Sequence, residues 1–197
     1  PNLNLVPKTT KVSLGWLQWL FLCKASMPPS SLPSIASDLH ELAFEMQMAI
    51  IAYSLSVALF IPLTAWAAAK FGTLTVFRSA VATFVLGSIG CAFAPNLNAL
   101  VLARVVQGIG GAFMMPVARL AIIQVVPKQQ LLNAWNLMAT AGLVVPILGP
   151  ILGGWLVMNA SWYWIFLINI PIGLLGIIAS GQVMSNTFKP LPLPFRQ

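Results

Sequence analysis

The chain has 197 residues, of which 59% are hydrophobic and 7% are charged, and its formal net charge is +7. A soluble domain carries about 25% charged residues, so this composition excludes an ordinary globular protein in water. The ten Lys and Arg residues are scattered singly rather than gathered into a stripe, which excludes a nucleic-acid partner.

Six apolar runs are long enough to cross a lipid bilayer. A helical span needs about 20 residues, and within lipid a helix satisfies all of its own backbone polar groups. The runs are continuous rather than short and alternating, which favours helices over barrel strands. The predicted spans are Leu14–Ala36, Met46–Ala69, Val76–Ala94, Leu97–Ala118, Leu132–Val157 and Tyr163–Met184. The sequence therefore predicts an all-α integral membrane protein, with its bundle at residues 14–184 between a cytoplasmic segment (1–13) and a cytoplasmic tail or linker (185–197).

The first predicted span carries a cation and a break. Lys24 lies well inside it, where inserting a charge costs about 2.5–3.5 kcal/mol. Pro28 and Pro29 follow one turn later and predict an interruption of the helix. The two cysteines, Cys23 and Cys91, fall inside predicted spans, where cysteine ordinarily behaves as a small buried apolar residue.

The cations outside the predicted spans, or at their ends, lie on one side of the predicted bundle, and the acids lie on the other. The outermost segments and every second loop carry Lys8, Lys11, Lys70, Arg78, Arg119, Lys128, Lys189 and Arg196. The other loops have no Lys or Arg, and the first of them, Ser37–Glu45, holds all three acids of the chain. The positive-inside rule then places both termini in the cytoplasm.

The fourth predicted span contains an arginine about two turns from its outer end. Arg104 could snorkel to the outer interface. Gln107, Gly111 and Met115 follow at intervals of three and four residues, so they share its helical face. This polar and small set favours a lined pathway or a helix seam over snorkelling.

The fifth predicted span has a face of small residues. Gly142, Pro146, Gly149 and Gly153 recur at intervals of four, three and four residues, which predicts close helix packing. Pro146 and Pro150 should bend or loosen the helix. A packing motif without further function is the alternative interpretation.

The sequence shows no carrier for enzyme chemistry. It has no catalytic Ser/His/Asp set, no phosphate-binding Gly-rich loop and no cluster of metal ligands. We therefore expect neither an enzyme nor a bound cofactor or metal.

Three segments carry a resemblance to a known family: LARVVQGIGGAFMMPVARL, GLVVPILGPILGGWLV and SWYWIFLINIPIG. They resemble the major facilitator superfamily, and more narrowly the amino-terminal half of bacterial multidrug exporters of the fourteen-helix drug:proton antiporter type. The resemblance implies six helices built as a 3+3 inverted repeat that form one half of a facilitator bundle in the bacterial inner membrane. Substrate would bind near the midplane, between this half and another.

The resemblance also implies roles for individual residues. Arg104 and Gln107 match a family motif associated with proton coupling. The pattern of the antiporter motif is matched by Gly142, Gly149, Pro150, Gly153 and Gly154. Lys70 and Gly72 match the family's cytoplasmic loop motif.

The chain departs from the family in its charges. Lys24 stands where the family has a membrane carboxylate. One interpretation gives Lys24 a role in proton coupling or in lining the cavity. The alternative is that its side chain snorkels to the interface or that selection on this position is relaxed. In the loop motif, Ala69 replaces an acid, and Leu74 and Thr75 replace cations, which should weaken the family's charge relay.

Two functions follow from these features. The first is an efflux half that exports small amphipathic compounds together with a second six-helix half, supplied by the same longer chain, a separate chain or a second copy. The alternative is a truncated or degenerate half without transport activity that serves as a membrane scaffold, favoured by the missing acids. Its partners would then be the bilayer and other proteins rather than a substrate.

Overall fold

The computed structural model describes residues 32–39, 44–125 and 161–183, together with positions 129, 131, 132, 136, 151, 154, 155, 158 and 159. Lys24 and four residues of the fifth-span motif, Gly142, Gly149, Pro150 and Gly153, lie outside this part. Every regular element within it is helical. The helices are α2 (Leu32–Leu39), α3 (Gln47–Phe60), α4 (Leu63–Phe71), α5 (Thr73–Ala92), α6 (Leu97–Val125), α8 (Trp164–Leu167) and α9 (Asn169–Val183).

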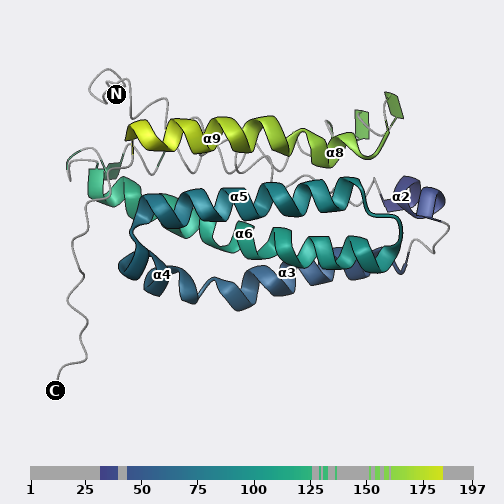
Figure 1. The fold of residues 1–197 in the computed structure, drawn as a ribbon, viewed down its shortest axis with the longest axis horizontal. Helices are drawn as coiled ribbons and strands as arrows, with labels where there is room; N and C mark the ends of the chain where they lie inside the picture. Colours follow the sequence, from purple (N-terminus) through teal and green to yellow (C-terminus); the bar gives the residue numbers. More distant parts are fainter. Residues whose placement is uncertain are drawn as a thin grey trace.

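The longer helices α3, α5, α6 and α9 lie side by side along roughly one common direction (Figure 1). α5 and α6 form the middle of the described bundle and pack against each other along their lengths. α9 and α8 cover α5 on one side, while α3 and α4 follow α6 on the other (Figure 1). α2 lies at the end where α5 turns into α6, as Figure 1 shows.

Two of the described helices, α5 and α6, are long and apolar enough to cross a membrane. The pair α3 and α4 passes the same test when it is counted as one broken span, so up to three spans fall in the described residues. The second to fourth predicted spans therefore correspond to α3–α4, α5 and α6. Most of the first and fifth predicted spans lies outside the described part.

The second predicted span is bent, which corrects the prediction of one continuous helix. α3 and α4 meet at an angle of 58°. Pro62 stands between them and has no N–H to continue the helical hydrogen bonds. The hydroxyl of Thr64 donates to the Ile61 carbonyl at 2.7 Å, so it satisfies one backbone acceptor at the bend.

The sixth predicted span runs as one helix through the boundary between α8, which ends at Leu167, and α9, which begins at Asn169, because Ile168 between them keeps a helical conformation. Pro171 explains the boundary, because proline has no N–H to donate to the carbonyl four residues earlier, here that of Leu167. The fourth span differs at its end: α6 continues to Val125 and contains Pro116.

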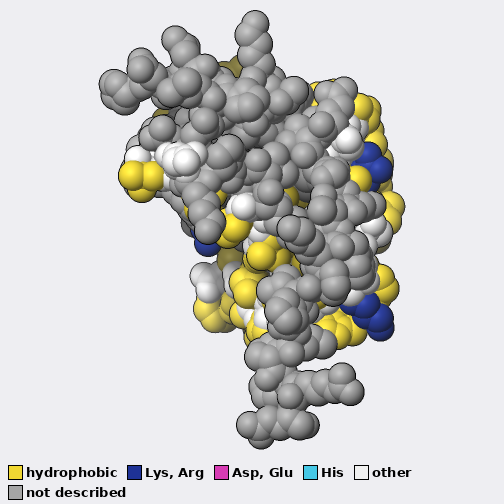
Figure 2. All heavy atoms as spheres, turned by 90° about the vertical axis from the view of Figure 1, so that its left-hand side faces the viewer, with side chains coloured by type: hydrophobic (Ala, Val, Ile, Leu, Met, Phe, Trp, Pro, Cys, Tyr) yellow, Lys and Arg dark blue, Asp and Glu magenta, His cyan; other side chains and the backbone are white. Residues whose placement is uncertain are grey.

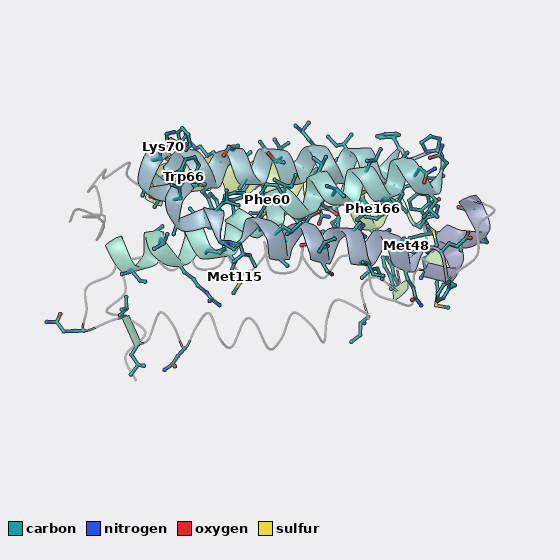
Figure 3. All side chains as sticks on the ribbon, turned by 90° about the horizontal axis from the view of Figure 1, so that it is seen from below. Met48, Phe60, Trp66, Lys70, Met115 and Phe166 are labelled. Atoms are coloured by element: carbon teal, nitrogen blue, oxygen red, sulfur yellow. The ribbon has the colours of Figure 1, made fainter. Side chains whose placement is uncertain are left out.

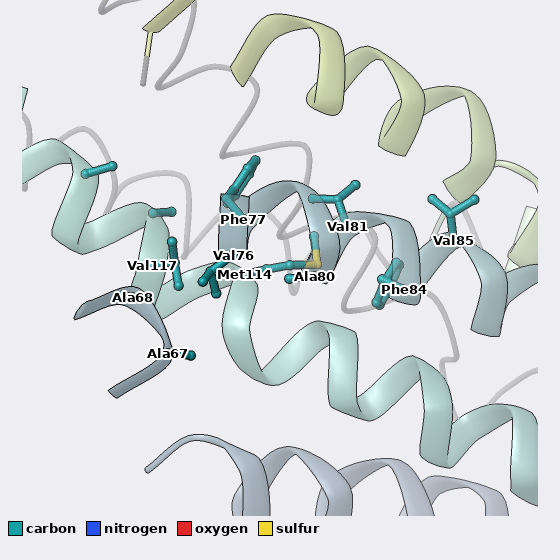
Figure 4. Packing of buried hydrophobic residues seen from close by; sticks show 12 residues of the cluster. Ala67, Ala68, Val76, Phe77, Ala80, Val81, Phe84, Val85, Met114 and Val117 are labelled. Carbon is teal, nitrogen blue, oxygen red and sulfur yellow. The ribbon is translucent and has the colours of Figure 1, made fainter. Parts of the chain in front are cut away.

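The buried apolar residues form two clusters at different depths. One gathers α4, α5 and α6 around Phe77, Phe84 and Met114, as Figure 4 shows. The other lies toward the α5–α6 turn and joins Ile35, Leu100 and Phe166. Each cluster therefore draws on several helices that are far apart in the sequence.

The outward surface of the bundle is apolar. Large side chains such as Leu59, Leu86, Leu102 and Ile178 are each more than 60% exposed. In water such a surface would favour aggregation, whereas in a bilayer it faces lipid chains or neighbouring helices.

Apart from Arg104, the described charged residues lie toward the two ends of the bundle. Lys70, Arg78 and Arg119 lie toward the end where α4 finishes and α5 begins. Figure 2 looks at this end and shows Lys and Arg side chains at its rim, with no acidic side chain among the coloured atoms. Asp38 and Glu45 belong to the opposite end, beside α2 and the start of α3.

Candidate functional site

Buried polar side chains occupy the layer between the two apolar clusters. On α5, Ser88 lies between Val85 of one cluster and Cys91 of the other. On α6, Arg104 and Gln107 fall in the corresponding interval. A polar layer inside a membrane bundle is costly to insert, so it marks a candidate functional site.

A chain of hydrogen bonds links these three residues across two helices. Arg104 Nη1 donates to Gln107 Oε1 at 2.8 Å, and Gln107 Nε2 donates to Ser88 Oγ at 2.7 Å. Ser88 Oγ donates in turn to the Phe84 carbonyl at 3.0 Å. Arg104 is 4% exposed, and Gln107 and Ser88 are fully buried. The amide of Gln107 thus joins the cation on α6 to a hydroxyl on α5.

Glycines let α5 and α6 approach closely enough for this bridge. A Cβ on Gly87 would lie 2.5 Å from the backbone nitrogen of Gln107, and one on Gly110 would lie 2.5 Å from the backbone nitrogen of Phe84. Both distances are far below a normal contact, so only glycine fits at these positions. The close crossing brings the Gln107 amide to Ser88.

A second pair of glycines brings α3 to the other side of α6. A Cβ on Gly108 would lie 2.7 Å from the Ser56 Cβ, and one on Gly111 would lie 2.9 Å from the Tyr53 Oη. Tyr53 therefore packs beside the polar layer. Its ring centre is 5.8 Å from the guanidinium carbon of Arg104.

The guanidinium of Arg104 is enclosed by aromatic rings from two other helices. Phe166 of α8 lies 4.7 Å from the guanidinium carbon, closer than Tyr53 of α3. This enclosure shows that Arg104 does not snorkel to the interface. Within the described part of the chain, its Nε and Nη2 have no hydrogen-bond partner.

The predicted loop residues Lys70 and Gly72 lie away from this layer. Gly72 adopts a φ of 84° and a ψ of 149°, which side-chain-bearing residues rarely adopt, and it connects α4 to α5. Lys70 is exposed, with its Nζ 4.9 Å from the centre of the Trp66 ring (Figure 3). The structure thus does not bring the loop residues together with Arg104 and Gln107.

Of the fifth-span motif only Gly154 lies in the described part. A Cβ at Gly154 would have no heavy atom within 4 Å in that part. Its face is therefore open among the described helices.

A hydrogen bond joins two segments that are far apart in the sequence, at the end of the bundle beside α2. Trp162 Nε1 donates to Asp38 Oδ2 at 2.8 Å, although the residues are 124 positions apart. Trp162 is buried and meets Phe166 edge to face, at a centroid distance of 6.2 Å. The contact holds α2 against the segment that enters α8.

Sequence reasoning missed three residues of the site: Ser88, Tyr53 and Phe166. Helical periodicity places Gln107 beside Arg104 on one helix, but it does not reveal which neighbouring helix faces them. Gly87, immediately before Ser88, was the available signal, because a small residue inside a span marks close helix contact.

The architecture is that of a multi-pass helical membrane protein with a polar layer inside its bundle. Among solved structures, the proton:xylose symporter XylE, a major facilitator superfamily protein, matches with a TM-score of 0.77 over 90% of this chain and 45% of its own. At 13% sequence identity this likeness shows the fold alone.

Sequence comparison defines the family. The family model of the major facilitator superfamily matches residues 14–189. The chain belongs to the major facilitator superfamily, a family of transporters rather than enzymes. A probable transport protein of Haemophilus influenzae, HsrA, is 75% identical over 177 residues, and a putative multidrug resistance protein of Citrobacter koseri, MdtD, is 48% identical over 157.

These matches cover most of this chain but a minor part of each relative. They include 88% and 80% of this chain, yet only 38% of the HsrA chain and 33% of the MdtD chain. The chain thus spans about a third of the length of these curated relatives.

Proposed function

We propose that the chain is the amino-terminal half of an exporter that moves small amphipathic compounds out of a bacterial cell across the inner membrane. In this proposal both termini lie in the cytoplasm, and a second six-helix half completes the transport path. The likeness to a putative multidrug resistance protein supports the export direction and substrate class. The limited coverage of the longer relatives supports the need for a second half.

The buried Arg104–Gln107–Ser88 chain is the observation that carries the proposal. A purely structural bundle gains nothing from a cation at this depth, because an apolar side chain would fill the same space without the cost of desolvating a charge. A transporter uses such a group to bind substrate or couple ions. Arg104 would serve this purpose, with Gln107 and Ser88 holding its orientation.

Accumulation in cells tests the proposal. Cells lacking their own exporters would express the chain alone or with the part of the Haemophilus influenzae HsrA relative that lies beyond the matched segment. The cells would be loaded with anionic, neutral and cationic fluorescent compounds. We expect lower accumulation of at least one compound in the pair only, and its loss in Arg104→Gln.

The matched control is Arg119→Gln, which removes the same charge from an exposed position of α6. This variant should export like the wild type. Unchanged accumulation in the pair, with both parts present in the membrane, would favour the scaffold alternative. Full export by Arg104→Gln would remove Arg104 from the mechanism.

A further inference from the structure

We infer that Arg104 is the binding point for the acidic group of the transported compound, so that the exporter takes small amphipathic organic carboxylates. This inference rests on the proposed export function and narrows its substrate class. It follows from two buried guanidinium nitrogens that have no hydrogen-bond partner among the described residues, from the positions of all acids in the chain, and from the rings around Arg104.

The free edge of the guanidinium has the geometry for a carboxylate. Arg104 uses Nη1 on Gln107, while Nε and Nη2 have no hydrogen-bond partner among the described residues. Nε and Nη2 point along one side of the guanidinium plane and together form the two parallel bonds of an arginine–carboxylate pair. Since Gln107 accepts from Nη1, it fixes the direction in which this edge faces.

The chain supplies no carboxylate at this depth. Its three acids are Asp38, Glu41 and Glu45, so none follows residue 45 or precedes residue 38. Asp38 already accepts from Trp162 at the outer end of the bundle, whereas Arg104 lies about two turns inside α6. A buried cation without a counter-charge is strongly unfavourable. The compensating anion must therefore come from outside this chain.

The surroundings suit an amphipathic ligand. Phe166 and Tyr53 flank the guanidinium from α8 and α3, so the immediate surroundings of the buried charge are apolar and aromatic. An organic anion can place its acidic group on the free edge and its hydrocarbon part against such rings. An inorganic anion would use only the charge.

Binding of a matched pair of ligands tests the inference. The probes are 1-naphthaleneacetate and 1-naphthylmethylammonium, which share a ring system and differ in the sign of their charge. Equilibrium dialysis would measure both on the purified complex of the chain with its second half. We expect 1-naphthaleneacetate to bind the wild type about tenfold more tightly than the ammonium compound, and Arg104→Gln to lose this preference.

Two further variants separate charge from geometry. Arg104→Lys keeps the charge but lacks the two-donor edge, so it should bind 1-naphthaleneacetate several-fold more weakly than the wild type. Arg119→Gln should bind like the wild type. If Arg104→Gln fails to fold, comparison of the wild type with Arg104→Lys still decides the question.

Equal affinity of the wild type for both probes would overturn the inference, as would unchanged preference in Arg104→Gln or full affinity in Arg104→Lys. An acid of the second half on the free edge would exclude 1-naphthaleneacetate from the complex, and this result would also overturn it. Export of cationic compounds without anion binding would refute the inference while leaving the proposed function intact. Failure to export any compound would refute the proposed function independently of the dialysis result.

Discussion

Ser88 belongs to the candidate site because of its contact with Gln107 on the facing helix α6. Taken within α5, its hydroxyl makes an ordinary bond to the carbonyl one turn earlier, as serines in membrane helices commonly do. The tertiary contact adds the amide of Gln107 as a donor at 2.7 Å in a fully buried place. Because Gln107 and Ser88 are fully buried, the loss of Ser88 Oγ leaves that donor without its partner.

Replacing Ser88 with alanine should therefore destabilise the bundle by about 1–2 kcal/mol. The control is Ser79→Ala on the same helix, since Ser79 is exposed and its hydroxyl donates to the Val76 carbonyl within α5. Unfolding of the purified protein in detergent measures both. Equal effects of the two substitutions would show that the Gln107–Ser88 bond contributes nothing to stability.

The candidate site was predictable in part at this scale. Arg104 and Gln107 stand out because polar residues are rare in apolar spans and the two are one helical turn apart. The aromatic partners do not stand out, since Tyr53 and Phe166 look like ordinary residues of apolar helices. Their role depends on which helices touch α6.

α6 joins its two neighbours through glycines on two faces. Gly110 turns toward α5 and Gly108 toward α3, so one helix packs tightly on both sides. Close backbone contact increases dispersion and weak polar attraction, which drive helix association where lipid removes the hydrophobic effect. The same contacts hold the polar layer in register.

Gly110→Ala should separate α5 from α6 and cost about 1–3 kcal/mol, because the new Cβ would lie 2.5 Å from the Phe84 nitrogen and 2.6 Å from the Ala80 oxygen. Both obstacles are backbone atoms that cannot move alone. Gly181→Ala on α9 is the control, since its Cβ would meet only the far end of the Arg78 side chain, which can rotate away. Thermal unfolding in detergent should separate the two variants. A Gly181→Ala effect as large as that of Gly110→Ala would contradict this account.

At a proline, the local sequence predicts where a helix changes, but it does not predict the angle of a bend. Pro62 interrupts the second predicted span, whereas Pro171 only removes one backbone hydrogen bond from the sixth, and both prolines can be read from the sequence. The size of the bend at Pro62, 58°, depends on how α4 packs against α5 and α6. Hydropathy alone merged α3 and α4 into one straight span.

At the scale of the whole molecule, cations and acids lie toward opposite ends of the bundle. Three cations gather at the end where α4 meets α5, and the described acids belong to the opposite end, beside α2 (Figure 2). The positive-inside rule then assigns the α4–α5 end to the cytoplasm. This assignment is a prediction that labelling can test.

Single cysteines at the two ends should react from opposite sides. In a background with Cys23 and Cys91 replaced by alanine, Asn98→Cys near the start of α6 should react with a membrane-impermeant maleimide in intact cells. Thr75→Cys near the start of α5 should react only after permeabilisation. Both positions are exposed, so accessibility of the side chain itself does not differ. The reverse pattern would invert the predicted topology.

The sequence by itself determined that this protein lies in a lipid bilayer rather than in water, that it is helical, and which family it belongs to. These properties depend on quantities that sum along the chain, such as hydropathy over about 20 residues, or on local motifs such as the segment around Arg104. Tertiary structure alone decided that Arg104 is enclosed rather than snorkelling, that Ser88 completes its hydrogen-bond chain, and that Phe166 and Tyr53 flank it. Those contacts join helices far apart in sequence. Their geometry is set by how closely glycines allow the backbones to approach, which no local pattern specifies.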